Sequence, residues 1–276
     1  MLPSDSSLYA PPRLITTLED CYFYHTIDIP GYGLVEGEWD LRQGIDAYLG
    51  KVVFKGKRVL ELGTASGFVC FHMEREGADV VAYDLSDQHD WDVVPYGQYD
   101  YSDFMRERRK HIAKLNNGFW LCHRVFKSKS RMVYGDIYSV PATIGAVDIS
   151  TFCSILLHVR DPFLALERAL RLTRETVIVT EPAGKLPIPS FLRANVRLPR
   201  SRPAMTFLPD WRRREPKETW WRLSPGIVQE FIATLGFEKS SVTYHLQSYR
   251  RGRLTVRLPQ FTVVGHRTSE VGSGAS

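Results

Sequence analysis

The stretch that decides the fold of this chain is Val59-Leu60-Glu61-Leu62-Gly63-Thr64-Ala65-Ser66-Gly67, residues 59–67. It contains a short apolar run with an acid near its end, followed by a Gly-x-x-x-Gly loop. Residues 68–76 have the composition of a helix that Gly77 would end, and a second apolar run over 79–83 leads to Asp84. A strand, a glycine loop, a helix and a second strand ending in an acid form the unit that binds adenosine-containing cofactors.

The composition indicates a folded domain. The 276 residues suffice for one large α/β domain with an insertion or for two small domains, and 43% of them are hydrophobic. The first residues lack the apolar core of a signal peptide, and no apolar stretch approaches the roughly 18 residues of a membrane span. The four cysteines are scattered, which is typical of free thiols in a reducing compartment. We therefore expect a cytoplasmic protein without a membrane partner.

Strand and helix patterns alternate along the chain. Strands are predicted over 58–62, 79–84, 132–134, 148–157 and 176–180. Helices are predicted over 68–76, 102–116, 162–172 and 225–235. Two last strands, 240–248 and 260–267, are close enough to pair as antiparallel neighbours. The expected fold class is α/β: a doubly wound, mostly parallel seven-stranded sheet with an antiparallel C-terminal strand pair and an inserted cap.

The composition also suggests how the chain is divided. The expected parts are an N-terminal cover (1–56), a cofactor-binding core (57–182), an inserted substrate cap (183–224), the C-terminal part of the core sheet (225–268) and a disordered tail (269–276). The cap is inferred because residues 183–222 are rich in proline and arginine without a clean period, and long irregular stretches in compact domains are usually functional.

Several residues around the glycine loop have a physical reason to bind a cofactor. Gly63 permits a tight turn and Gly67 a close approach of ligand to backbone. A carboxylate at Glu61 suits an ammonium group, Asp84 can accept both ribose hydroxyls, and Asp136 can accept from an adenine amino group. The remaining predicted cofactor contacts are Thr64, Ala65, Leu85, Ile137 and Cys153. No set of His, Asp and Glu has metal-ligand spacing, so no metal is expected.

Other ligands fit the loop less well. The dinucleotide pattern Gly-x-Gly-x-x-Gly fails at Ala65, and no phosphate-binding P-loop is correctly spaced. An acid at the strand end without a phosphate cradle favours S-adenosylmethionine over NAD. The alternative that Gly63 and Gly67 are only turn residues stays open at this point.

These residues resemble class I S-adenosylmethionine-dependent methyltransferases. The resemblance rests on Glu61-Leu62-Gly63-x-x-x-Gly67, Asp84, Gly135-Asp136-Ile137 and residues 176–181. A narrower resemblance, to relatives of the tRNA wobble-uridine (carboxy)methyltransferase family, rests on residues 155–162, 24–27 and 219–225. Leu157 stands where that family has a tyrosine, and no counterpart of its N-terminal basic residue is found in 24–39. The resemblance therefore implies a methyltransferase that uses ordinary S-adenosylmethionine.

Candidates for the reacting end lie beyond the strands. In this kind of sheet the acceptor meets the cofactor past the carboxyl ends of the fourth and fifth strands, where His158 and Glu181 lie. His158, Glu181 and His25 are the catalytic candidates, as base or substrate anchor. Each also has a structural alternative: a histidine bonded to backbone, a loop cap and an aromatic core cluster. Aromatic faces suit a sulfonium cation, and the predicted substrate contacts are Tyr24, Trp39, Trp220 and Trp221.

The partner is less well defined than the cofactor. Residues 193–214 contain seven arginines and one acid, a pattern compatible with a solvated surface, an acidic small molecule or RNA phosphates. No separate basic RNA-binding module is visible. We therefore predict methyl transfer by direct displacement to a small molecule, acidic or partly apolar, such as a specialised metabolite or glycan. A tRNA-modifying methyltransferase and a non-catalytic binding protein of the same fold are the alternatives.

Overall fold

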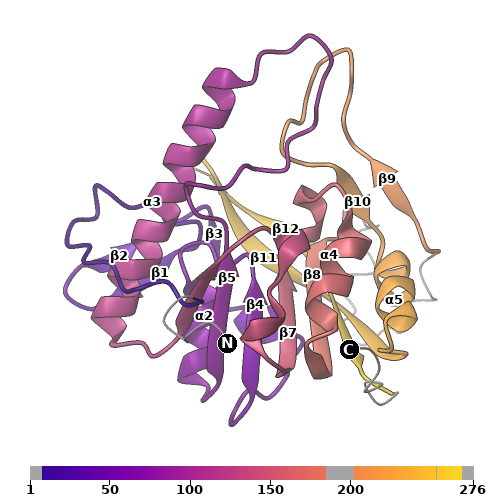
Figure 1. The fold of residues 1–276 in the computed structure, drawn as a ribbon, viewed down its shortest axis with the longest axis horizontal. Coiled ribbons are helices and arrows are strands. Elements are labelled where there is room, and N and C mark those ends of the chain that lie inside the picture. The colour runs from indigo at the N-terminus through magenta and orange to yellow at the C-terminus, as the bar shows by residue number, and fades with distance from the viewer. Residues whose placement is uncertain (1–7, 185–201, 253, 269–276) are drawn as a thin grey trace.

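The computed structural model describes residues 8–184, 202–252 and 254–268. Its centre is an eight-stranded sheet in the order β3-β11-β12-β8-β7-β4-β5-β6 (Figure 1). The strands of its parallel part are β4 (Arg58–Leu62), β5 (Asp79–Asp84), β6 (Arg131–Tyr134), β7 (Val147–Cys153) and β8 (Thr173–Pro182). β12 (Leu254–His266) runs antiparallel to β8, and β11 (Lys239–Arg251) runs antiparallel to β12.

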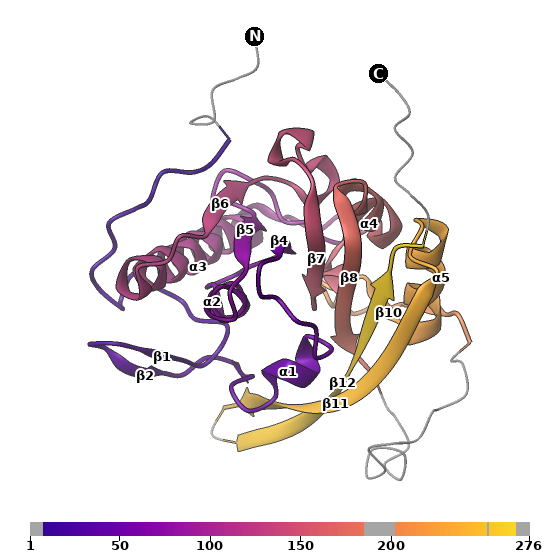
Figure 2. The ribbon, with the colours of Figure 1, turned by 90° about the horizontal axis from the view of Figure 1, so that it is seen from below.

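Two layers of helices bury the two faces of this sheet. One face packs against α1 (Ile45–Tyr48), α2 (Phe68–Arg75) and α3 (Ser102–Phe126), and the other against α4 (Pro162–Leu170) and α5 (Pro225–Thr234). Figure 2 shows α2 and α3 on one side of the strands and α4 and α5 on the other. Alternate residues of one strand serve the two cores: Val59 belongs to the first and Leu60 to the second. Because both faces are covered, the strands of the parallel part are buried over most of their length.

The predicted α/β class is confirmed, but the sheet has one strand more than expected. The extra strand is β3 (Trp39–Asp40), which pairs with β11 through Trp39–Tyr249 and Asp40–Ser248. It is two residues long and belongs to the N-terminal segment. It is therefore too short for an alternation of apolar and polar residues that would predict a strand. The same segment also forms a small hairpin from β1 (Ile27–Ile29) and β2 (Gly33–Val35).

Several element ends differ from the predicted ones, and two of these differences have a visible cause. β7 ends at Cys153 rather than at residue 157, because Ser154 adopts a left-handed conformation (φ 55°) and Leu156–His158 forms a 3-10 turn. α3 continues ten residues beyond the predicted end at 116, and Lys127, also left-handed, closes it. The buried side chains Phe119, Trp120 and Leu121 hold this extension against the core.

The predicted cap corresponds to the segment between β8 and α5. Its residues 185–201, and the predicted tail 269–276, lie outside the described residues. In the described part, β9 (Met205–Phe207) pairs antiparallel with β10 (Trp221–Leu223). The loop between them meets the β5–α3 connection, because the Val94 amide donates to the Lys217 carbonyl (Figure 1). The division of the chain into five parts stays a prediction.

Among the residues that the structure describes, no helix combines the length and the apolar character needed to cross a membrane. All four cysteines are free thiols.

Candidate active site

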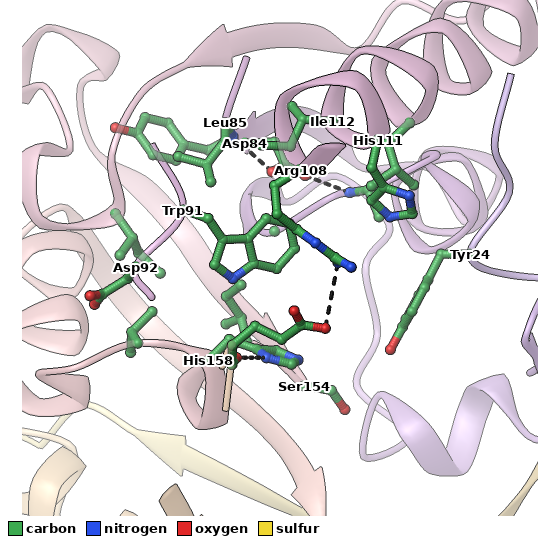
Figure 3. Close-up of a pocket in the computed structure, with 18 of the residues that line it drawn as sticks. Tyr24, Asp84, Leu85, Trp91, Asp92, Arg108, His111, Ile112, Ser154 and His158 are labelled. Carbon is green, nitrogen blue, oxygen red and sulfur yellow. Dashed lines mark hydrogen bonds and ion pairs between the residues drawn. The ribbon is translucent and has the colours of Figure 1, made fainter. Parts of the chain in front are cut away.

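A cavity of about 750 Å³ opens beyond the carboxyl ends of β4, β5, β6 and β7. The side chains come from these strand ends, from α3, from the N-terminal segment and from the loop that precedes β10 (Figure 3). The predicted site residues in its wall are Tyr24, His25, Gly63, Ala65, Asp84, Leu85, Asp136, Ile137, Cys153 and His158. This is the place where open α/β sheets bind ligands.

Asp84 ties the glycine loop to the end of the second parallel strand. Its Oδ2 accepts a hydrogen bond from the Ala65 amide (2.6 Å), and its Oδ1 accepts from the Leu85 amide (2.7 Å). Burial raises the Asp84 pKa to about 6, although both backbone bonds act in the opposite direction. Each carboxylate oxygen keeps a second lone pair. Asp84 can therefore accept hydroxyl groups of a ligand while it holds the loop.

The two loop glycines have different structural roles. Gly63 (φ 80°) lines the cavity, and a Cβ there would lie 3.1 Å from Ile155 Cδ1. Gly67 (φ 88°) caps α2 and is absent from the described wall; a Cβ there would lie 2.4 Å from Phe71 Cε2 and 2.8 Å from Phe119 Cδ2. Helix packing rather than ligand approach therefore accounts for Gly67.

Glu61 lies beneath the loop instead of in the described cavity wall. Glu61 is 1% exposed, and the Thr64 hydroxyl donates a hydrogen bond to its Oε2 (2.5 Å). Burial raises the Glu61 pKa to about 8, so the carboxyl group is largely neutral at pH 7. Glu61 and Thr64 thus brace the loop, and the predicted contact of Glu61 with an ammonium group has no support in this geometry.

The adenine-side candidates follow β6. Tyr83 donates through its hydroxyl to the Asp136 carbonyl (2.7 Å), and Asp136 Oδ1 accepts from the Tyr138 amide (2.7 Å). A Cβ on Gly135 would lie 2.2 Å from Tyr83 Oη, so only glycine fits there. Because Oδ1 of Asp136 already accepts from Tyr138, its other carboxylate oxygen can accept a hydrogen bond from a ligand; Asp136 and Ile137 both line the wall.

His158 lies across the cavity from Asp84 (Figure 3). Its Nδ1 is 2.6 Å from the Glu218 carbonyl oxygen. Because a carbonyl only accepts, Nδ1 carries the hydrogen and the neutral ring keeps its lone pair on Nε2. Burial lowers the His158 pKa, which favours this neutral form. Nε2 is therefore the ring nitrogen that can accept a proton.

Three residues around His158 escaped the sequence prediction. Arg108 of α3 reaches across to Glu218 (3.4 Å) and lies over the Trp91 ring, 5.7 Å from its centroid. Trp91 meets the His158 ring edge-on, with centroids 6.3 Å apart. Trp91, Arg108 and Glu218 all line the cavity. They lie far apart in sequence and form no motif, so only the fold brings them together.

Comparisons with known proteins agree with this arrangement of strands. No family model matches the chain and no curated protein matches it. Two solved structures of the N-terminal domain of EvdMO1, one with SAH bound and one in the presence of SAH and D-fucose, each share 16% sequence identity with it. In both, the match covers 91% of this chain and 93% of that chain, with a TM-score of 0.51. The magnesium protoporphyrin IX methyltransferase of Synechocystis PCC 6803, with bound SAH, is less similar (TM-score 0.48, 12% identity, 82% and 83% covered).

The chain has the Rossmann-like methyltransferase fold. With β4 counted as the first core strand, the sheet order without β3 is 3-2-1-4-5-7-6. The antiparallel seventh strand, β12, lies between the fifth and the sixth.

Of the other two catalytic candidates, His25 lies in the described cavity wall and Glu181 does not. Glu181 is 1% exposed and absent from the described wall; its Oε1 accepts from the Leu156 amide (2.8 Å), which fits the loop-capping alternative. Burial raises the Glu181 pKa to about 8. His25 is 8% exposed and lines the cavity, and burial lowers its pKa to about 4.

Of the four aromatic residues predicted to contact substrate, the structure places only Tyr24 in the described wall. Trp39 packs on Tyr249 at the sheet edge, with ring centroids 4.8 Å apart. Trp220 is buried and donates to the Asp92 carbonyl (2.8 Å), and Trp221 donates to the Arg160 carbonyl (3.0 Å). None of these three tryptophans is among the described wall residues, so substrate contact by them stays a prediction.

Within the described ranges, no group of three or more His, Cys, Asp and Glu side chains could hold a metal ion.

Proposed function

We propose that this chain is an S-adenosylmethionine-dependent methyltransferase that methylates a hydroxyl group of a small molecule. The observation that carries the proposal is that Asp84 and His158 lie on opposite sides of one cavity of the methyltransferase fold. Bound there, S-adenosylmethionine would supply a methyl group for direct displacement by an acceptor oxygen. The EvdMO1 structures, which hold SAH on the same fold, support this choice of cofactor.

The wall residues have distinct roles in binding the nucleoside. Asp84 would accept the ribose hydroxyls, and the turn at Gly63 and Ala65 gives the ligand room against the backbone. The free oxygen of Asp136 would accept from the adenine amino group beside Ile137. Leu85 and Cys153 complete the predicted contacts in the wall.

His158 would take the proton of the acceptor. A hydroxyl keeps its proton at neutral pH, so its methylation benefits from a base close to the oxygen. The Glu218 carbonyl holds the Nδ1 hydrogen and leaves Nε2 to accept that proton. This is why we infer an oxygen acceptor rather than an already nucleophilic nitrogen or carbon.

The charge of the wall narrows the acceptor class. Six carboxylate residues line the cavity, against Arg108 as the one arginine or lysine among the described wall residues. The six are Glu38, Asp84, Asp90, Asp92, Asp136 and Glu218. Asp90, Asp92 and Glu218 are in ion pairs with Arg109, Arg160 and Arg108. The remaining wall carboxylates, Glu38, Asp84 and Asp136, suit the cationic cofactor and disfavour an acidic acceptor or RNA phosphates. A neutral, hydroxyl-rich acceptor such as a sugar fits better, and D-fucose was present with one EvdMO1 structure.

Binding and turnover test the proposal separately. Calorimetry should show SAH binding to the purified protein, whereas no binding at millimolar SAH would favour the non-catalytic alternative. SAH release should then be measured with S-adenosylmethionine and D-fucose, other neutral sugars, or bulk tRNA. Residues 155–162 and 219–225, which carry the resemblance to the tRNA-modifying family, meet where the Trp220 amide donates to the Leu157 carbonyl. Turnover with tRNA alone, weakening steeply with salt, would overturn the small-molecule assignment.

A further inference from the structure

The N-terminal segment meets the cavity at the glycine-loop end. The Tyr24 amide donates to Ser66 Oγ (3.3 Å), and the His25 ring lies 5.6 Å from the ring of Phe68, the first residue of α2. Figure 3 shows Tyr24 and Ser154 on the side of the cavity opposite Leu85 and Asp92. A nucleoside whose ribose lies at Asp84 and whose base lies at Asp136 would therefore extend its 5′ substituent toward this segment.

Two side chains of this segment with hydrogen-bond acceptors line the cavity. Glu38 lines the wall, and its Oε1 accepts a bond from the Tyr22 hydroxyl. His25 also lines the wall, and its buried Nδ1 has no hydrogen-bond partner among the described residues. Gly37, the residue before Glu38, packs against the His25 backbone: a Cβ there would lie 2.4 Å from the His25 carbonyl carbon, so only glycine allows the two backbones to touch.

We propose that Glu38 and His25 bind the α-amino group of the cofactor's methionyl part. This inference rests on the proposed function and gives the N-terminal segment the task that the sequence assigned to Glu61. An ammonium group has three hydrogens to donate. Glu38 Oε2 can accept one of them, and the neutral His25 ring, which also lines the wall, can accept another through its lone pair. Burial keeps the His25 ring neutral, with its pKa lowered to about 4, so one ring nitrogen always has a free lone pair. Glu61 cannot compete, because it lies beneath the loop with Thr64 as its partner.

The test compares two ligands that differ only beyond the sulfur. SAH carries the amino-acid part, and 5′-methylthioadenosine has a methyl group in its place. We expect Glu38→Gln to weaken SAH binding by about 10- to 100-fold, the value of a charge-assisted hydrogen bond. Binding of 5′-methylthioadenosine should stay within about twofold. Glu36→Gln is the matched control, because Glu36 lies two residues away, pairs with Arg250 and is not part of the cavity wall.

Each outcome decides one question. If the wild-type protein binds neither ligand, the proposed function fails before this inference is reached. If it binds both but E38Q weakens both equally or leaves SAH unchanged, the inference is wrong and the function stands. Circular dichroism checks that E38Q is folded; should it unfold, Glu38→Asp and His25→Asn are compared in the same way. We then expect H25N to weaken the binding of SAH but not that of 5′-methylthioadenosine, and E38D to keep the wild-type preference between the two ligands.

Discussion

Glu181→Gln is the sharpest test of how this protein holds its buried carboxyl groups. The pKa of Glu181 is raised by burial from 4.5 to about 8. The folded state therefore holds a proton on Glu181 between pH 4.5 and 8 that the unfolded chain has released. Stability must fall as pH rises through that window, because the unfolded state binds fewer protons. A glutamine has no proton to lose, so the variant lacks this contribution.

The size of the effect follows from the same values. The rise in pKa corresponds to about 5 kcal/mol over the full window, and to about 2 to 3 kcal/mol between pH 6 and pH 9. Near pH 6 the variant should be at most about 1 to 3 kcal/mol less stable, because the glutamine oxygen can still accept from the Leu156 amide. By pH 9 it should match or exceed the wild-type protein.

Urea unfolding at intervals from pH 6 to pH 9 measures this difference. Glu167→Gln, an exposed position on α4, is the control for loss of a negative charge at the surface. A flat pH dependence of this difference for E181Q would refute the reasoning, since it would mean that Glu181 is already ionised in the folded protein.

Three further substitutions test the site. Gly67→Ala should lower the unfolding free energy by about 2 to 4 kcal/mol, because its Cβ meets Phe71 and Phe119 and its φ is left-handed. A loss of about 2 kcal/mol lowers the melting temperature by about 3 °C in a chain of this size, so a smaller shift would contradict this expectation. Asp84→Asn should weaken both SAH and 5′-methylthioadenosine by about 10- to 100-fold in calorimetry, whereas selective loss of one would speak against ribose binding. His158→Asn should reduce kcat by about 10²- to 10⁴-fold at unchanged SAH affinity. It should also remove the fall in wild-type rate that protonation of His158 causes below pH 6.5, since its pKa is lowered; a mutant that keeps this limb would exclude His158 as the base.

Much of the fold was predictable because its signals are local. The apolar runs of β4 and β5 and the glycines between them specify a parallel pair with a helix crossover, and both strands have the predicted ends. β3 was not predictable, since two residues carry no period and its pairing partner Tyr249 is some 200 positions away. The end of β7 was missed because the Glu181 side chain, not local propensity, holds the turn at Leu156.

The site was predictable where a residue's role depends on its own strand end. Asp84 ends β5, Asp136 lies shortly after β6, and His158 lies in the 3-10 turn that follows β7; all three are in the cavity wall. Glu61 shows the limit of this reasoning: its position in the motif was clear, but whether its side chain points into the cavity or beneath the loop depends on Thr64 and the packing of α2. Arg108 and Glu218 could not be paired from the sequence, because the connection that brings them together has no regular pattern.

The N-terminal segment has a consequence for how relatives of this protein can diverge. The same twenty residues supply the edge strand β3 and the wall residues Tyr22, Tyr24, His25 and Glu38. A substitution here that changes ligand preference can also disturb the pairing of β3 with Ser248 and Tyr249, which covers part of the outer edge of β11. Ligand selectivity and resistance to aggregation are therefore expected to co-vary in natural variants, and exchanging this segment between homologues would transfer both traits at once.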